Sequence, residues 1–327
     1  MIIRKANIAD VPAIMQFIKE HWNENHILAR DREFFEWMYV DEEGCNFIVA
    51  VDDENKIYGI EGVIKYNSST CPDISGTVWK TLKTDNPCLG LEIGEKMYEI
   101  FHPRGDMALG LNKKAMKINL LLGYLGGKMS HYYILGNCDD YKVAIVNQKQ
   151  ERVSQIKKKK FVPITSEEML RSLIDDEIQK KKMPYKDADY IVHRYWKHPI
   201  YQYDILGIKD ENDDVRSMIV GRSISCNKTK VYRFVDFIGV YEDLRETASC
   251  FYQMVDDENY EYMDLYCVGI PEEIIKSMGF VERIQEEVIV PNYFSPFERK
   301  NIDMYFVSSQ SEDLVVFRGD GDQDRPN

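Results

Sequence analysis

Three ionisable residues stand where a side chain could transfer a proton. His131 lies in an apolar run beside two tyrosines, and the charge of histidine changes near neutral pH, which suits it to act as a general base. His26 lies between two predicted helices. Asp236 lies inside the apolar run 234–237, where a carboxylate must be paired or face a cleft, with Arg222 or Arg233 as partner. The alternative for each residue is a structural role, as an oriented histidine or an internal ion pair.

A second group of side chains could bind a ligand through aromatic rings. Tyr201 has Tyr195, Tyr203 and His198 close to it in the chain, and Tyr132 follows His131. Because tyrosine combines a large ring with a polar tip, such a group could line a surface for a sugar or nucleotide. Packing in the core is the alternative interpretation.

Charge and cysteine content exclude several classes of function. The formal net charge of −13 would repel a phosphate backbone, so we expect no nucleic-acid partner. The 7 cysteines are scattered without CxxC pairs, which indicates reduced thiols rather than a disulfide framework or a zinc site. The acidic tail lacks the last glutamate of a calcium loop, so we expect no metal.

The N-terminus and the distribution of apolar residues predict a cytoplasmic protein. Charges at Arg4, Lys5 and Asp10 interrupt the first ten residues, which is unlike a signal peptide. No apolar stretch reaches the roughly 18 residues needed to span a bilayer, so we expect no membrane insertion. We expect a monomer or a homodimer.

Hydrophobic periodicity predicts a mixed α/β first half. A short strand at residues 2–6 is followed by helices at 10–18 and 31–39, and then by a hairpin over 47–66. A strand at 77–84, a helix at 91–101, a strand at 107–111 and a helix capped by Asn112 follow. Residues 124–135 would close this half as a strand or hairpin.

A second half repeats this order of elements. Strands are expected at 201–208, 217–225, 232–237, 262–266 and 287–290, with helices at 244–255 and 272–278. Both halves have a helix ending in glycine, as Leu122-Gly123-Tyr124 and Met278-Gly279-Phe280. With 327 residues, two domains are expected. We assign them to residues 1–138 and 189–295, joined by a partly helical linker at 139–188 and followed by a tail at 296–327.

The first half resembles the GNAT superfamily of N-acyltransferases, and the second half does so more loosely. The resemblance rests on the hairpin, the strand, glycine loop and helix over 79–92, the segment 109–115 and Leu122-Gly123-Tyr124. Segments 25–31, 110–112, 130–133 and 319–327 also resemble GNAT-like proteins of bacterial surface-polysaccharide gene clusters. The resemblance implies two GNAT-like domains in tandem, the first of which binds acyl-CoA.

In this superfamily, backbone N–H groups at a helix N-terminus hold the pyrophosphate of CoA, and a glycine lets the backbone approach it. In the matching segment 86–94, Gly90 fits the family motif, whereas Glu92 stands where a small residue is usual. The preceding strand would splay from its neighbour and pair with the pantetheine arm. The donor contacts implied by the resemblance are Leu82, Lys83, Thr84, Gly90, Leu91 and Asn112.

Many family members protonate the leaving thiolate with a tyrosine before the Leu-Gly-Phe motif. Asn119 stands at that position and cannot act as an acid, so the acid lies elsewhere or the thiolate leaves without one. Family acceptor sites lie between the first two helices, near His26. The acceptor contacts that we expect are Arg30, Tyr132, Tyr201 and Arg222.

Together these features predict transfer of an acetyl or other short acyl group from acyl-CoA to the amine of a nucleotide-linked amino sugar. His131, Asp236 and His26 are the candidate catalytic residues, and the second half would shape the acceptor site without a donor site of its own. Two alternatives remain open. One is an aminoacyl-tRNA-dependent transferase with paired GNAT-like halves, and the other is a non-catalytic sugar-binding protein on a degenerate GNAT fold.

Overall fold

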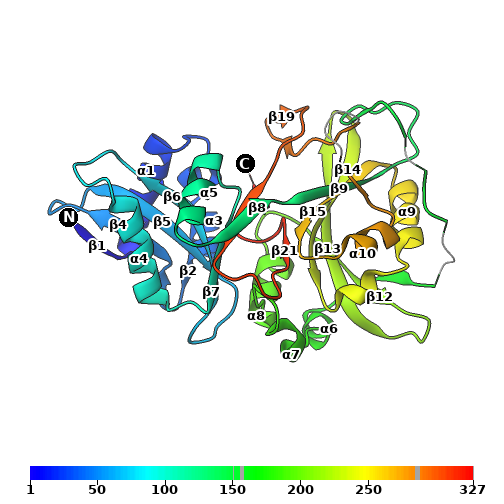
Figure 1. Cartoon of the computed structure of the whole chain (residues 1–327), viewed down its shortest axis with the longest axis horizontal. Coiled ribbons are helices and arrows are strands. Elements are labelled where there is room, and N and C mark those ends of the chain that lie inside the picture. Colours follow the sequence, from blue (N-terminus) through cyan, green and yellow to red (C-terminus); the bar gives the residue numbers. More distant parts are fainter. Residues whose placement is uncertain (150, 155–157, 284–287, 327) are drawn as a thin grey trace.

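A computed structural model describes residues 1–149, 151–154, 158–283 and 288–326. Two mixed sheets lie side by side, and helices pack against each of them (Figure 1). The C-terminal segment runs between the two sheets. The mixed α/β class and the division into two halves agree with the sequence prediction.

The first sheet is built mainly from the N-terminal part of the chain. Its strand order is β1 (Ile2–Lys5), β4 (Phe47–Val51), β5 (Ile57–Lys65), β6 (Asp73–Thr81), β7 (Gly105–Leu109), β20 (Tyr305–Ser308) and β8 (Leu125–Lys128). Strands β4 and β5 form the predicted antiparallel hairpin. Strands β6 and β7 are parallel, and helix α4 (Leu89–Phe101) connects them.

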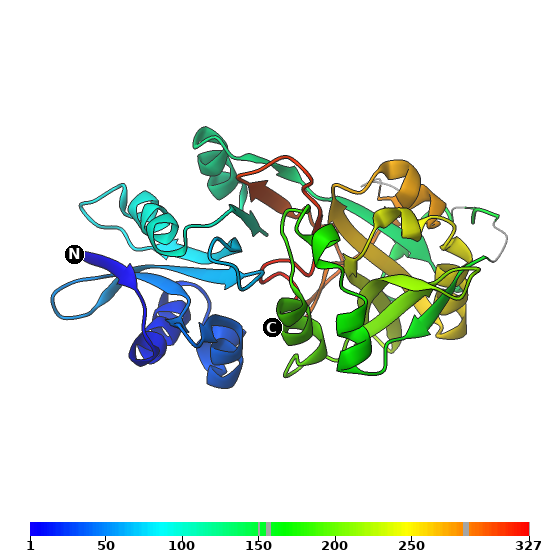
Figure 2. The same ribbon diagram turned by 90° about the horizontal axis from the view of Figure 1, so that it is seen from below.

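Helices cover both faces of this sheet, as Figure 2 shows. On one face lie α1 (Val11–His21), α2 (Ile27–Arg30) and α3 (Arg32–Tyr39). Helix α4 covers the other face, because its residues Leu89, Ile93, Met97 and Phe101 share one side and are buried against Ile48 and Val63. The predicted helices of this half are confirmed, including the cap at Asn112 for α5 (Lys113–Leu121).

The second sheet repeats this plan. Its order is β11 (Lys160–Pro163), β12 (Asp204–Lys209), β13 (Val215–Cys226), β14 (Thr229–Ile238), β15 (Tyr260–Val268), β9 (Ser130–Leu135) and β16 (Val281–Glu282), with β21 (Val316–Phe317) on β15. Helix α9 (Ala248–Asp257) connects the parallel strands β14 and β15, as α4 connects β6 and β7. Helix α10 (Glu272–Ser277) follows β15.

The glycines that end α5 and α10 support the view that the second half repeats the fold of the first. Gly123 after α5 and Gly279 after α10 have φ angles of 93° and 83°, which favour glycine. Tyr124 N–H donates to the carbonyl of Asn119, and Phe280 N–H donates to the carbonyl of Ile275 in the same way. Each helix therefore ends with the same kind of backbone hydrogen bond, from the N–H of one residue to the carbonyl five residues earlier.

The predicted closing strand of the first half was wrong. Residues 125–135 form two strands that lie in different sheets, because β8 pairs with β20 and β9 pairs with β15. Buried Met129 lies at the crossing, and its N–H donates to the carbonyl of Met304. A boundary at residue 138 therefore does not separate the two sheets.

The predicted tail and linker also contribute to the sheets. Within 296–327, β20 inserts between β7 and β8 of the first sheet, and β21 pairs with β15 of the second. Within 139–188, β11 forms an edge of the second sheet, and α6 (Glu167–Ser172) and α7 (Asp176–Gln179) follow it. The strand expected at 287–290 is β17 (Val288–Ile289), while positions 287 and 327 lie outside the described residues.

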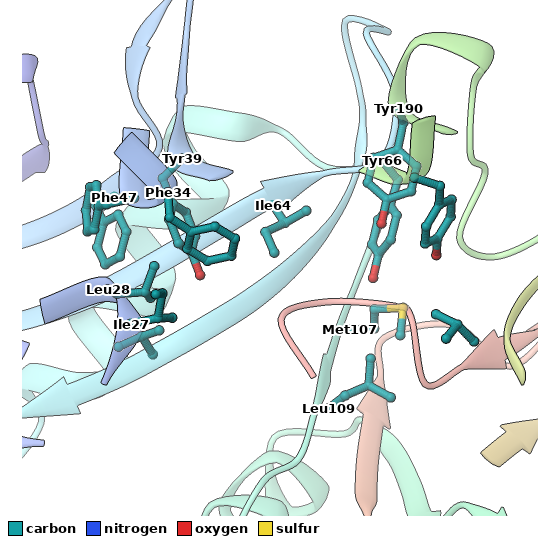
Figure 3. Packing of buried hydrophobic residues seen from close by; sticks show 14 of the residues in the cluster. Ile27, Leu28, Phe34, Tyr39, Phe47, Ile64, Tyr66, Met107, Leu109 and Tyr190 are labelled. Carbon is teal, nitrogen blue, oxygen red and sulfur yellow. The ribbon is translucent and has the colours of Figure 1, made fainter. Parts of the chain in front are cut away.

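One hydrophobic cluster crosses between the halves. It joins Phe34, Tyr39 and Phe47 of the first half to Tyr190, which lies in α8 (Ala188–Ile191). Figure 3 shows Tyr66 beside Tyr190, with ring centroids 5.0 Å apart. No helix among the described residues is long and apolar enough to cross a membrane.

Candidate active site

The parallel strands β6 and β7 pair only at their start and then diverge. Residues 73–75 of β6 face residues 105–107 of β7, and the register ends there. On the other side of β6, Lys80 faces Ile60 and Thr77 faces Gly62, so Val78 and Trp79 together oppose Glu61. This bulge turns the middle of β6 away from regular pairing. Val78 has a φ of 47°, which is strained for a β-branched residue and marks a functional candidate.

A cavity of about 700 Å³ occupies the gap between these strands. At the gap, its walls are residues 76–79 of β6 and residues 106–112, which run from β7 to the N-cap of α5. On the α4 side it reaches Gly90, Leu91 and Tyr98. On the opposite side it reaches Trp22, after α1, and Asp322 and Arg325 of the C-terminal segment. The cavity thus passes through the sheet and opens toward both faces.

The N-terminus of α4 forms the first end of this cavity. Asn86 orders the preceding loop, because its Oδ1 accepts the Cys88 N–H at 2.9 Å and its Nδ2 donates to both carboxylate oxygens of Glu92 at 2.9 Å. Glu92 is therefore held by Asn86 and does not line the cavity. A Cβ at Gly90 would lie 2.9 Å from Cζ2 of Trp79, so the missing side chain makes room for that indole.

A group of acidic and phenolic side chains lines the middle of the cavity. Glu61 of β5 is 9% exposed, and its Oε2 has no hydrogen-bond partner among the described residues. Burial, aided by the nearby Asp106 carboxylate, raises the pKa of Glu61 to about 8. Asp106 accepts hydrogen bonds from the hydroxyls of Tyr98 and Tyr124, although burial still raises the pKa of its carboxyl group.

The C-terminal segment forms the second end of the cavity. Gln323 donates to the carbonyl of Leu109 at 3.2 Å, and Tyr66 contacts the N–H of Gly321 at 2.8 Å. Asp322 pairs with Arg325 at 3.0 Å and accepts a bond from Gln323 at 2.7 Å. These contacts hold one carboxylate and one guanidinium in the cavity wall, at the mouth opposite α4.

Solved structures described as N-acyltransferases or probable N-acyltransferases have a similar fold over almost the whole chain. A probable N-acyltransferase of Enterococcus faecalis V583 aligns with 94% of this chain and 71% of its own, at 7% identity and a TM-score of 0.57. A GCN5-related N-acetyltransferase of Anabaena variabilis aligns over 94% and 72%, at 9% identity and a TM-score of 0.55. A fungal GCN5-related glucosamine N-acetyltransferase region aligns over 94% and 38%, at 11% identity and a TM-score of 0.53.

The chain has the GNAT fold. No protein-family model and no curated protein matches the sequence. Because the identities are low, the likeness establishes the fold alone. The expected tandem of two GNAT-like halves is confirmed.

In this GNAT fold, three of the six expected donor residues line the cavity. They are Gly90, Leu91 and Asn112. Leu82, Lys83 and Thr84 are not among its lining residues, because β6 ends at Thr81 and the diverging residues are 76–79. The hydroxyl of Thr84 instead donates to the carbonyl of Asn86 in the loop before α4.

His26 does not line the cavity, but the charges of Arg325 and Asp322, which do line it, act on its ring. It caps α2, and its Nδ1 accepts the Leu28 N–H at 3.2 Å, which places the proton of the neutral ring on Nε2. Burial and the charge of Arg325 lower its pKa to about 4. A ring in this tautomer is a hydrogen-bond donor rather than a free base. Arg30 ends the same short helix and is exposed.

His131 and Tyr132 lie away from the cavity, in strand β9 of the second sheet. The His131 ring stacks on Tyr266 at 3.9 Å, and its Nε2 lies 3.5 Å from Asp264. Burial lowers its pKa to about 4 despite that carboxylate. Tyr132 packs in the hydrophobic core of the second half. These contacts agree with the alternative interpretation of His131 as an oriented structural histidine.

Asp236 forms a buried ion pair, and neither predicted partner was correct. Lys186 lies 2.7 Å from both Asp236 and Asp320, and the hydroxyl of Tyr195 donates to Asp236 at 2.6 Å. Arg233 instead pairs with Asp264 at 3.1 Å. Lys186 comes from the segment expected to be a linker, so no local pattern identified it.

The expected sugar-binding residues hold the C-terminal segment instead. Arg222 donates to both carboxylate oxygens of Asp324 at 2.9 Å, and Tyr203 donates to one of them at 2.9 Å. The Tyr201 hydroxyl donates to the carbonyl of Arg325, and the Arg222 guanidinium lies over the Tyr201 ring. These residues therefore fix the position of the C-terminal segment that lines one end of the cavity.

The second pair of parallel strands also diverges, but protein fills its gap. Strands β14 and β15 pair up to Phe234 and Leu265. Beyond that point β21 pairs with β15, and Gly319 N–H donates to the carbonyl of Val235 at 2.8 Å. A Cβ at Gly319 would lie 2.4 Å from the Tyr195 hydroxyl, so this packing is close.

Sequence reasoning missed Glu61, Asp106 and Asp322. Glu61 was detectable, because it is a charged residue inside the apolar run 57–66 and thus resembles Asp236. The position of Asp322 depends on a tail that returns to the first sheet, and no local pattern signals that return.

Proposed function

We propose that this protein is an N-acyltransferase that moves an acetyl or other short acyl group from acyl-CoA to the amine of a small molecule. The cavity between β6 and β7 is the observation that supports this proposal. It reaches a helix N-terminus on one face and a carboxylate on the other, so a donor and an acceptor could meet within the sheet.

The residues at the α4 end suit the donor. Backbone N–H groups at the start of α4 attract anions, and the Glu92 carboxylate is bound by Asn86 rather than turned into the cavity. The Nε1 of Trp79 is buried without a partner among the described residues, so it is free to donate to a ligand beside Gly90. The bulge at Val78 and Trp79 provides backbone groups along the path of the pantetheine arm.

The proposed acceptor is the amine of a nucleotide-linked amino sugar used in surface-polysaccharide synthesis. Asp322 offers a carboxylate for an ammonium group, while Trp22 and Tyr293 offer aromatic surfaces at the rim of the cavity. The fungal region with a similar fold is described as acting on glucosamine, which supports an amino-sugar acceptor. We further propose that Gly90, Leu91 and Asn112 contact the donor.

Calorimetry with CoA and acetyl-CoA tests the donor site. Gly94 lines the cavity, and a Cβ there meets no atom within 4 Å, so a Gly94→Trp variant should fold while its indole enters the cavity. We expect this variant to bind CoA at least about tenfold more weakly. Lys96→Trp is the matched control, since it places the same ring on α4 outside the cavity lining.

Release of free thiol from acetyl-CoA, measured with a panel of nucleotide-linked amino sugars, tests the reaction. Wild-type protein that shows no CoA affinity, or Gly94→Trp protein that binds CoA normally, would refute the donor site. CoA binding without thiol release for any amine would refute the transferase proposal.

A further inference from the structure

The leaving thiolate in the proposed reaction needs a proton, and the residues commonly suited to this task are occupied. Asn119 cannot act as an acid, and its Nδ2 donates to the carbonyl of Ala115 within α5. Tyr98 and Tyr124 both direct their hydroxyls to the Asp106 carboxylate. Burial, reinforced by that carboxylate, raises the pKa of both phenols, which makes them poor proton donors.

Glu61 lines the same cavity, from the strand next to the gap where the thioester would be held. The bulge residues Val78 and Trp79 are directly across from Glu61, and Thr77 begins the diverging part of β6. A Cβ added at Gly76 would lie 2.9 Å from Oε1 of Glu61, so the absent side chain at Gly76 makes room for this carboxyl group. The carboxyl group therefore lies against the central wall of the cavity.

We infer that Glu61 is the general acid that protonates the sulfur of the departing CoA thiolate. This inference rests on the proposed acyl transfer. As the amine nitrogen forms its bond to the acyl carbon, the carbon–sulfur bond breaks and its electron pair goes to sulfur. The carboxyl group of Glu61 gives its proton to that sulfur, which yields the free thiol. The proton that the amine loses on becoming an amide passes to solvent, and a proton taken up from solvent restores the Glu61 carboxyl group, so the protons balance.

The surroundings of Glu61 favour its protonated, neutral form. It is buried and has no cation among its cavity neighbours on β6, β7 or α4, while Asp106 and Glu95 add negative charge on two of these elements. Both effects disfavour the carboxylate form, in agreement with the raised pKa given above. Glu61 lies on the α4 face, whereas Asp322 lies at the opposite mouth, so the proton donor and the incoming amine approach from different sides.

Kinetics of Glu61→Gln with two kinds of thioester tests the assignment. With acetyl-CoA and hydroxylamine as acceptor, we expect kcat to fall by about 10²–10³, while calorimetry shows unchanged CoA affinity. With an aryl thioacetate, whose thiolate leaves without protonation, we expect less than about a tenfold loss. Glu61→Asp should restore part of the acetyl-CoA rate. Glu99→Gln, an exposed change on α4, is the matched control.

Wild-type protein provides a second test that needs no variant. The acetyl-CoA rate should fall as pH rises above about 8, while the aryl thioacetate rate should not. Infrared difference spectra should also show a protonated carboxyl group at neutral pH that is absent from Glu61→Gln.

Each result bears on the assignment in a distinct way. Equal losses with both donors, or no alkaline decline with acetyl-CoA, would overturn the role of Glu61 while leaving the transferase proposal intact. Wild-type protein that binds CoA but transfers no acetyl group to any amine would overturn both.

Discussion

At the scale of single residues, two buried carboxyl groups at or near the cavity differ in their surroundings. Glu61 has no cation among its cavity neighbours on β6, β7 and α4, and burial raises its pKa to about 8, which favours the protonated form at neutral pH. Asp324 is also buried, but the guanidinium groups of Arg222, Arg318 and Arg233 together outweigh the effect of burial and hold the pKa of that carboxyl group well below its usual range. The first arrangement suits proton transfer, and the second suits anchoring.

Glu61→Gln should change how stability depends on pH. The folded-state pKa of about 8 exceeds the ordinary glutamate value of 4.5, so the wild-type folded state retains a proton that the unfolded chain releases between these values. Wild-type stability should therefore fall as pH rises through this window. We expect the variant to be more stable than wild type by about 1–3 kcal/mol near pH 9, with little difference near pH 4. Urea denaturation at several pH values measures this, and a pH-independent difference would contradict it.

Asp324→Asn should destabilise the protein strongly. The change leaves Arg222 without its buried counter-charge, for which a loss of about 3–5 kcal/mol is typical. Urea unfolding measures the loss, with Glu272→Gln as the control, because that carboxylate belongs to an exposed pair worth at most about 1 kcal/mol. Because the segment carrying Asp324 also holds Asp322, acceptor affinity should weaken more than CoA affinity. An equal effect on both affinities would argue against this role of the segment.

At the scale of elements, two glycines of α4 contribute differently. Gly90 makes room for the Trp79 ring, whereas a Cβ at Gly94 meets no atom within 4 Å. Glycine inside a helix lowers stability relative to alanine because it loses more backbone freedom on folding.

Gly94→Ala should therefore raise the free energy of unfolding by about 0.5–1 kcal/mol. Gly90→Ala should lower it, since the new Cβ would lie 2.9 Å from the indole. Thermal denaturation of the two variants compares them directly on the same helix. Stabilisation by both changes would show that the Trp79 contact does not constrain Gly90.

At the scale of the whole molecule, the halves exchange strands and share a core. Strand β20 from the end of the chain pairs with β7 and β8, while β9 from the first half pairs with β15. The packing of Tyr66 on Tyr190 joins the two halves further. Neither half closes its own sheet without the other.

A fragment of residues 1–138 should therefore fail to fold, because β7 and β8 lose the strand between them. The full chain should unfold in one calorimetric transition with equal van't Hoff and calorimetric enthalpies. Circular dichroism of the fragment and calorimetry of the full chain test this. A folded fragment, or two resolved transitions, would show that the halves are independent.

The sequence by itself determined the local elements. The spacing of Val11, Ile14 and Ile18 predicted α1, Asn112 predicted the start of α5, and the glycines at 123 and 279 predicted two helix ends. These features depend on contacts within one or two turns of the chain, so local pattern is sufficient for them.

Only the tertiary structure decided which strands pair and which side chains meet. Asp324 meets Arg222 across 102 positions, and Ser308, near the end of the chain, pairs with Met107 in the first sheet. Hydrophobic pattern shows that a strand is buried but does not identify its neighbour, so β9, β20 and the tail were misplaced. For the same reason the tyrosines and Arg222 predicted to bind a sugar turned out to hold the chain's own C-terminal segment, whose carboxylate fits the same donors.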